Sequence, residues 1–231
     1  YICTDATAGA NVWTNVGAGS GDIVPWQFGG TQYGYAAGGY PNSTQINRFS
    51  FASDGNATDH GDKFAHGANR FGGGTQSPTH GYITSGGTTV TISKFAFAGT
   101  GVTGTDVGDL TRVRDRPGTH STETYGFVCG GEPVDNGIER FSFTTDGNST
   151  DWADMTTQRQ NLVGSSSLTH GYNSCGYLGG ILNVIDRFPF ATQTNATDVG
   201  DSTLARDSCA SSSSTTHGYT AGGNASPNTD V

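Results

Sequence analysis

The stretch INRFSF at residues 46–51 decides the fold, because its pattern of Ile, any residue, Arg or Lys, Phe, any residue and Phe returns three more times. The later copies lie at residues 92–97, 138–143 and 185–190, so that successive isoleucines are 46, 46 and 47 residues apart. A fixed period of about 40–50 residues is typical of repeated supersecondary units. The chain is therefore expected to repeat one small structural unit.

Two further motifs keep the same period. The first is a Gly-aromatic pair that is followed a few residues later by Gly-Gly. Its aromatic members are Tyr35, Tyr82, Phe127, Tyr172 and Tyr219. The second is Thr-Asp, which follows each Ile by 12 or 13 residues at positions 58, 105, 150 and 197. The same spacing separates Ile2 from Thr14 and so identifies a degenerate first copy. Five copies are predicted.

Each copy reads as four short β-strands. The Ile-x-Arg-Phe-x-Phe stretch alternates with the period of two that strands require. Asp54-Gly55 and Asp146-Gly147 then supply the positive φ angles of a tight hairpin turn. Serine-rich stretches such as residues 164–167 and 211–214 suit a crowded inner strand. The prediction is one all-β domain over residues 1–231, with repeats at about 2–45, 46–91, 92–137, 138–184 and 185–231.

Composition narrows the class of protein. Glycine supplies 37 of 231 residues, while 12 Phe, 9 Tyr and 3 Trp give the chain aromatic mass to bury, so a turn-rich folded β protein is favoured over a disordered one. No apolar run approaches the length of a membrane-spanning helix, and we expect no membrane span. The formal charge of -9 would repel phosphate backbones, so we expect no nucleic acid partner.

The order of motifs resembles the Kelch repeat, whose members form β-propellers with four-stranded blades. The stretches IDRFPF (185–190), NATDVGD (195–201) and THGYTAGG (216–223), together with residues 1–17, are similar to Kelch-like structural and tail proteins of tailed phages of marine bacteria. The resemblance covers the whole chain and implies a five-bladed propeller. The chain departs from it in a first copy without the Phe-x-Phe pair and in fewer blades than the six or seven usual for Kelch proteins.

The phase of the repeat also predicts how such a propeller would close. The chain begins at the Ile-containing strand and runs to just beyond Gly222-Gly223. Its last two strands are therefore expected to join residues 1–16 in one shared blade, which would remove both sheet edges.

Candidate site residues are those at repeated turns and those that break the repeat. His80, His170 and His217 precede the Gly-aromatic motif, Tyr33 and Thr124 are expected to replace them in the other copies, and Glu123 precedes Thr124. The arginine-rich stretch at residues 112–116 is irregular. The predicted binding rim consists of His80, His170, His217, Tyr33, Glu123, Arg112, Arg114 and Arg116.

Catalysis, metals and cofactors are not predicted. Equivalent histidines on separate blades would be spread around a ring, too far apart to share a metal ion. A nucleophile elbow of the form Gly-x-Ser-x-Gly is missing from the sequence. We therefore expect no catalytic residue, no metal and no cofactor.

Three classes of function remain. The resemblance implies a virion component, such as a tail, fibre or decoration protein, displayed in multiple copies and contacting the host surface or another virion protein. A secreted glycan-binding lectin is the alternative, and it would predict five near-equivalent pockets between blades. An enzyme would instead predict one pocket in one irregular blade. The expected location is the virion, or otherwise the extracellular space.

Overall fold

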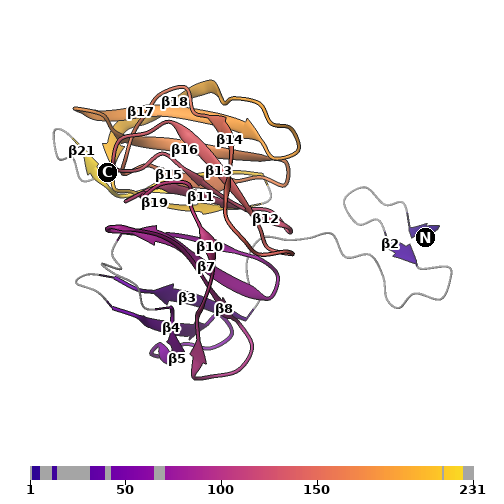
Figure 1. The fold of residues 1–231 in the computed structure, drawn as a ribbon. Coiled ribbons are helices and arrows are strands. Elements are labelled where there is room, and N and C mark those ends of the chain that lie inside the picture. Colours follow the sequence, from indigo (N-terminus) through magenta and orange to yellow (C-terminus); the bar gives the residue numbers. More distant parts are fainter. Residues whose placement is uncertain are drawn as a thin grey trace.

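The computed structural model describes residues 2–5, 12–14, 32–39, 43–64, 71–214 and 216–225, and every regular element in these ranges is a β-strand (Figure 1). The chain is therefore an all-β protein, as its sequence predicts. None of the described residues belongs to a helix that could cross a membrane.

Most strands belong to five successive antiparallel sheets, named here sheets I to V in chain order. Sheet I contains β3 (Tyr33–Ala37), β4 (Gln45–Ser50), β5 (Thr58–Asp62) and, beside β5 in parallel, β9 (Val102–Thr103). Sheet II contains β6 (Gly73–Gln76), β7 (His80–Gly86), β8 (Thr89–Ala96) and β10 (Thr105–Asp109). Sheet III contains β11 (Gly118–Ser121), β12 (Tyr125–Cys129), β13 (Gly137–Ser142) and β14 (Thr150–Asp154).

Sheets IV and V complete the series. Sheet IV contains β15 (Val163–Ser166), β16 (His170–Tyr177), β17 (Ile181–Pro189), β18 (Thr197–Asp207) and β21 (Asn224–Ala225). Sheet V consists of β19 (Ala210–Ser213) and β20 (Gly218–Ala221). The prediction of four short strands per unit is confirmed in sheets II and III, whereas sheets IV and V contain five and two strands. The predicted repeat boundaries at residues 45/46, 91/92, 137/138 and 184/185 fall within β4, β8, β13 and β17.

The repeated motifs have local structural causes. The Ile of the first motif lies opposite a residue 15 positions later in three sheets, as in Ile46↔Gly61 and Ile138↔Ala153. A register shift follows at this point, and in sheet I the Asp59 carboxylate accepts a hydrogen bond from the Gly61 amide at 2.9 Å. Thr-Asp-x-Gly-Asp is thus a β-bulge sequence. At the predicted hairpin turn, Asp146 and Gly147 adopt φ angles of 53° and 108°.

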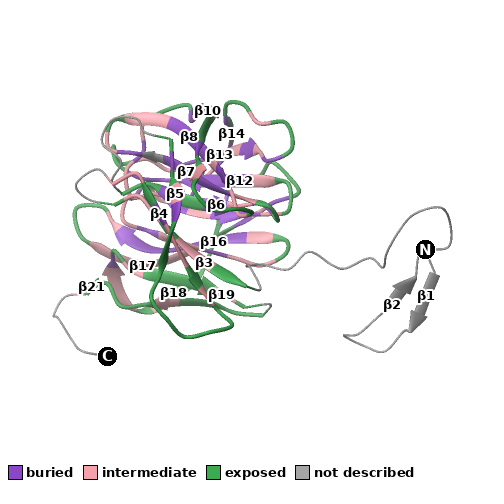
Figure 2. Cartoon of the chain, turned by 90° about the horizontal axis from the view of Figure 1, so that it is seen from below, coloured by how far each residue is buried: buried purple, intermediate pink, exposed green. Residues whose placement is uncertain are grey.

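The core lies between successive sheets. In sheets I to III the aromatic residue of the Gly-aromatic motif stacks on the second Phe of the Phe-x-Phe pair in the next sheet. The ring-centroid distances are 4.7 Å for Tyr35 and Phe97, 4.5 Å for Tyr82 and Phe143, and 5.0 Å for Phe127 and Phe190. Buried residues accordingly concentrate in the middle strands, whereas sheet V is largely exposed (Figure 2).

The first strands of sheets II to V lie side by side. The Gln76 amide donates a hydrogen bond to Ser121 Oγ at 2.9 Å, and the Ser166 amide donates one to Ser213 Oγ at the same distance. Thr119 Oγ1 donates to the Gly74 carbonyl at 2.8 Å in the same manner. The small residues predicted for an inner strand therefore allow close approach and join neighbouring sheets through their hydroxyl groups.

The predicted shared blade is not formed, and this prediction is corrected by the strand pairing. Strand β1 (Ile2–Asp5) pairs with β2 (Val12–Thr14) in a separate two-stranded sheet, and β19 is the one partner of β20 among the described strands. Joining residues a few positions apart costs far less loop-closure entropy than joining residues 2–5 to residues 218–221. The described strands show neither a closed barrel nor a ring of five equal sheets.

Candidate binding rim

A repeated turn joins the first and second strands of sheets II to V, and we call these turns, with the start of β3 in sheet I, the turn rim. It comprises residues 77–80, 122–125, 167–170, 214 and 216–217, with Tyr33 at the start of β3. A hydroxyl group shapes each turn by accepting a hydrogen bond from the amide three residues later. The accepting residues are Ser77, Thr122, Ser167 and Ser214, with distances of 3.1, 2.9, 3.0 and 3.0 Å.

One ring-bearing residue stands at the same place in every turn. His80 lies opposite Ala96, His170 opposite Pro189 and Tyr33 opposite Ser50, at the ends of equivalent strand pairs. In sheet III the residue in this position is Tyr125, opposite Ser142. The prediction that Thr124 replaces His is therefore wrong by one residue, because the pairing of β12 with β13 fixes the register.

The rim histidines are oriented in the same way. The Nδ1 atom of His80 lies 2.8 Å from Thr79 Oγ1, and His170 and His217 make the same contact with the threonine that precedes them, at 2.9 and 2.8 Å. This contact leaves the Nε2 atom of each ring without a partner among the described residues. Each imidazole can thus offer one nitrogen to a ligand.

Basic side chains lie behind the rim rings. The guanidinium of Arg48 is 4.5 Å from the Tyr33 ring centroid, and that of Arg140 is 4.3 Å from the Tyr125 ring centroid. These are cation–π distances. Lys94 occupies the same position in sheet II and binds Asp146 at 3.0 Å. The rim is therefore a row of rings backed by cations, on a chain whose net charge is negative.

Burial and these cations also set the charge of the histidines. Partial burial lowers the pKa of His80, and the nearby Lys94 lowers it further. Partial burial and Arg187 act in the same direction on the pKa of His170. Both imidazoles are therefore neutral at pH 7, so they offer hydrogen bonds and flat ring faces instead of charge.

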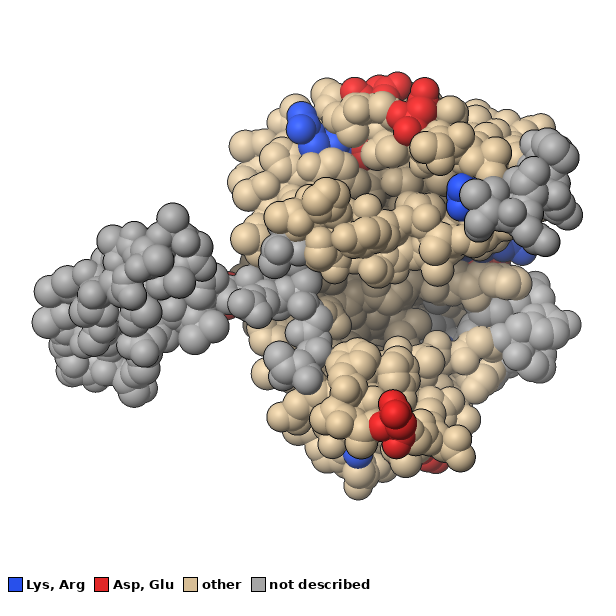
Figure 3. All heavy atoms as spheres, turned by 180° about the vertical axis from the view of Figure 1, so that it is seen from behind, with Lys and Arg blue, Asp and Glu red and all other residues tan. Residues whose placement is uncertain are grey.

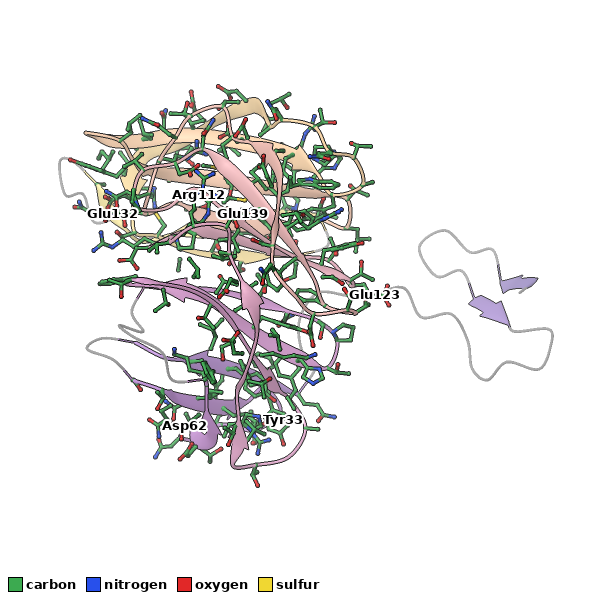
Figure 4. The ribbon with its side chains drawn as sticks, viewed as in Figure 1. Tyr33, Asp62, Arg112, Glu123, Glu132 and Glu139 are labelled. Atoms are coloured by element: carbon green, nitrogen blue, oxygen red, sulfur yellow. The ribbon has the colours of Figure 1, made fainter. Side chains whose placement is uncertain are left out.

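Glu123 belongs to the rim, but the three candidate arginines do not. Glu123 is exposed in the turn that follows β11, whereas Arg112, Arg114 and Arg116 precede β11 and so lie at its other end. Figure 4 shows Glu123 at the right-hand edge of the sheets, whereas Arg112 lies well to its left, over the sheets. The predicted set of eight residues therefore divides into two groups, because the sequence did not show at which end of a strand each loop lies.

The three arginines are already engaged by carboxylates. Arg114 is buried and donates to Glu139 at 2.8 Å, Arg116 donates to Glu132 at 2.9 Å, and Arg112 donates to Asp135. Burial alone would raise the pKa of Glu139, but the Arg114 guanidinium and hydrogen bonds from Ser149 and Thr111 hold it below its usual value. These arginines stabilise the loops of sheet III.

The buried ion pair is itself repeated, which sequence reasoning missed. Arg159 binds Asp186 at 2.7 Å, and both side chains are fully buried. Arg114 and Arg159 are 45 residues apart, and Glu139 and Asp186 are 47 apart. Two features of the sequence could have identified the pair. An arginine recurs with the period of the repeat, and a carboxylate residue follows the motif Ile in sheets III and IV.

A central cavity of about 640 Å³ opens between the sheets. Its walls include the first strands of sheets II to V, with Thr75, Thr119, Ser166 and Ser212, and Phe51 of sheet I. Among the described lining residues only His120 is titratable near neutrality, and burial lowers its pKa to about 4. The hollow in Figure 3 correspondingly shows neither acidic nor basic side chains.

A second cavity of about 510 Å³ lies between sheets IV and V. Hydroxyl groups dominate its lining, and His217 of the turn rim and Arg206 also contribute. Its lining therefore combines a rim histidine and a cation with hydroxyl groups suited to a polar ligand.

The described residues contain no group of three or more His, Cys, Asp or Glu side chains arranged to hold a metal ion. No protein-family model matches the sequence, and comparison with the curated proteins finds no match either.

Proposed function

We propose that this chain is a non-catalytic binding and structural module of a phage virion, built as a five-bladed Kelch-like propeller. In this proposal sheets I to V are the blades, and the protein serves as a tail, fibre or decoration component. Its partners are other virion proteins or a glycan or receptor on the host surface. The resemblance of its motifs to Kelch-like phage proteins supports the virion location.

The observation that carries the binding role is the turn rim. Five equivalent positions hold Tyr33, His80, Tyr125, His170 and His217, and the last four lie in turns shaped by the same hydroxyl contact. Flat rings combined with hydrogen-bonding nitrogens suit contact with sugars or with a protein surface. Display of many copies on one particle would convert weak contacts into strong attachment.

Competition for adsorption tests the proposed role. Excess soluble protein should slow adsorption of the phage to its host when the rim binds a host receptor. A variant that combines His80→Ala, His170→Ala and His217→Ala should lose this effect while retaining its circular dichroism spectrum. The matched control is Arg112→Ala, which changes an exposed side chain at the opposite end of the sheets. Equal competition by the two variants would refute a role for the rim.

Immunogold labelling of purified particles tests the location independently. Label on the tail or capsid supports a virion component. An unlabelled particle, together with protein in the culture medium, refutes the virion location.

A secreted glycan-binding protein is the second candidate, and the hydroxyl-rich cavity beside His217 favours it. Glycan-array binding that is lost in His217→Ala and retained in His80→Ala would support this function. It would also place the ligand in that cavity instead of along the rim.

A further inference from the structure

The two ends of the row of sheets expose aromatic side chains that are buried at internal positions of the repeat. At the first end, Phe49 and Phe51 of sheet I are 41% and 58% exposed. The equivalent pair in sheet III, Phe141 and Phe143, is 3% and 8% exposed. The Phe-x-Phe surface of sheet I therefore lacks the cover that the repeat provides elsewhere.

The other end lacks the complementary contact. Tyr219 of β20 is 54% exposed, whereas Tyr82 and Phe127, at the same place in sheets II and III, are 1% and 0% exposed. An exposed apolar surface that is buried in equivalent units indicates a contact site.

The internal sheets define the contact that each of these surfaces makes. The second-strand ring of one sheet stacks on the second Phe of the next sheet and lies 5.6 to 5.9 Å from the first Phe. Where the ring is a tyrosine, its hydroxyl donates to the carbonyl of that second Phe, at 3.2 Å for Tyr35 and 3.4 Å for Tyr82. Tyr219 has this ring and hydroxyl, and Phe51 has the ring and carbonyl that would receive them.

Both ends face the same space. Phe51 of sheet I and residues 211–213 of β19 line the central cavity together with the first strands of sheets II to IV. The row of sheets therefore curves so that its first and last members border one hollow.

We propose that sheet V docks on the Phe-x-Phe surface of sheet I in the same chain, with Tyr219 stacked on Phe51 and its hydroxyl bound to the Phe51 carbonyl. The contact closes the row of sheets into a ring. It specifies the contact that would close the propeller proposed above, and it rests on the observed repetition of inter-sheet contacts and not on the binding function. A surface and its complement at opposite ends of one chain could otherwise join copies head to tail into filaments. The shared cavity favours closure within one chain.

Photo-crosslinking tests the contact directly. A benzophenone side chain is introduced at position 219, equal amounts of isotopically heavy and light protein are mixed, and crosslinked peptides are identified by mass spectrometry. The expected result is a crosslink between position 219 and residues 49–51 that joins only light to light and heavy to heavy peptides. The matched control places the same group at Val199, which is 44% exposed on sheet IV. It should give no crosslink to residues 49–51.

Thermal unfolding of three variants provides a second readout. Tyr219→Ala and Phe51→Ala should each lower the melting temperature by several degrees, and the double variant should lose less than the sum, because contacting residues are not additive. Additive losses, or no crosslink to residues 49–51, would overturn the proposal. Crosslinks between heavy and light peptides would overturn it in favour of assembly between copies.

Discussion

Sheets III and I place different side chains in two positions that the repeat makes equivalent. The residue after the motif Ile is Glu139 in sheet III, buried and bound to Arg114, and Asn47 in sheet I, only half-buried. The residue that follows the last Asp of β14 in sheet III is Met155, and the residue that follows the last Asp of β5 in sheet I is Lys63; they are 3% and 2% exposed. Equivalent positions in different sheets can thus be compared directly. A position where one sheet holds a different kind of side chain shows where that side chain lowers or raises the stability of the sheet.

The largest expected effect is removal of the buried carboxylate of sheet III. Glu139→Ala leaves Arg114 buried without its 2.8 Å carboxylate partner and also removes the acceptor for the Thr111 amide. Breaking one side of a buried ion pair costs about 3–5 kcal/mol. Urea unfolding should show this loss, whereas Asn47→Ala, at the equivalent half-buried position, should cost about 1 kcal/mol or less.

Replacement of both partners sharpens the interpretation. The double variant Arg114→Met with Glu139→Leu should recover most of the stability that Glu139→Ala loses, since apolar pairs of similar volume substitute well for buried ion pairs. A double variant as unstable as the single one would show that the pair has a role beyond mutual compensation of charge.

His120 of sheet III should make stability depend on acid pH. It is 2% exposed, its Nε2 lies 2.9 Å from Asn173 Oδ1, and burial lowers its pKa from 6.5 to about 4. Between these values the unfolded chain binds the proton more readily than the folded chain. Stability from this group is thus complete above pH 6.5 and falls by about 2–3 kcal/mol as the pH drops toward 4.

The repeat offers a control for this titration. Sheet II has Thr75 at the equivalent position of β6. In His120→Thr the decrease in urea-unfolding free energy between pH 6.5 and 4 should be smaller than in the wild type. Identical pH profiles for the two proteins would assign the decrease to other groups.

Lys63 should destabilise sheet I at neutral pH. Its ammonium group has no partner among the described residues, and burial lowers its pKa from 10.5 to about 8. Lys63→Met installs the side chain that sheet III uses in the same place and should raise the free energy of unfolding by about 1–2 kcal/mol at pH 7.

The sign of the pH dependence distinguishes this cause from a gain in packing. Between pH 8 and 10.5 the unfolded chain holds the Lys63 proton and the folded chain releases it, so wild-type stability rises with pH through that window. The advantage of Lys63→Met should therefore shrink as the pH rises from 8 to 10.5. A constant advantage would point to packing alone.

The strands were predictable because their signals are local and repeated. The 46- or 47-residue spacing of the motif Ile and the Asp146-Gly147 turn were enough to place the hairpins. The pairing of β1 was not predictable in this way. The repeat shows which strands are equivalent, but not whether residues 2–5 pair locally or across the whole chain, where the entropic cost is much larger.

The candidate site was less predictable. Sequence placed His80, His170 and His217 correctly at equivalent turns, since one residue type recurred there. It misplaced the fourth member, because Thr124 and Tyr125 are neighbours and only strand register separates them. The sequence analysis also assigned Arg114 to a binding surface. Nothing in the charged loop itself indicates that Arg114 is buried and paired with a carboxylate 25 residues later in the chain.

The smallest expected effect concerns the ring at the rim of sheet III. The Arg140 guanidinium lies between Tyr125 and Trp152, at 4.3 and 3.8 Å from their ring centroids. Tyr125→His installs the rim residue of sheets II, IV and V and weakens one of these two cation–π contacts, so the expected loss of stability is about 0.5–1 kcal/mol. Thermal unfolding measures it, and His170→Tyr, which places a tyrosine beside Arg187 in sheet IV, should change stability in the opposite direction. A decrease in both variants would show that each turn is adapted to its own ring, and that the rim positions are equivalent in backbone but not in packing.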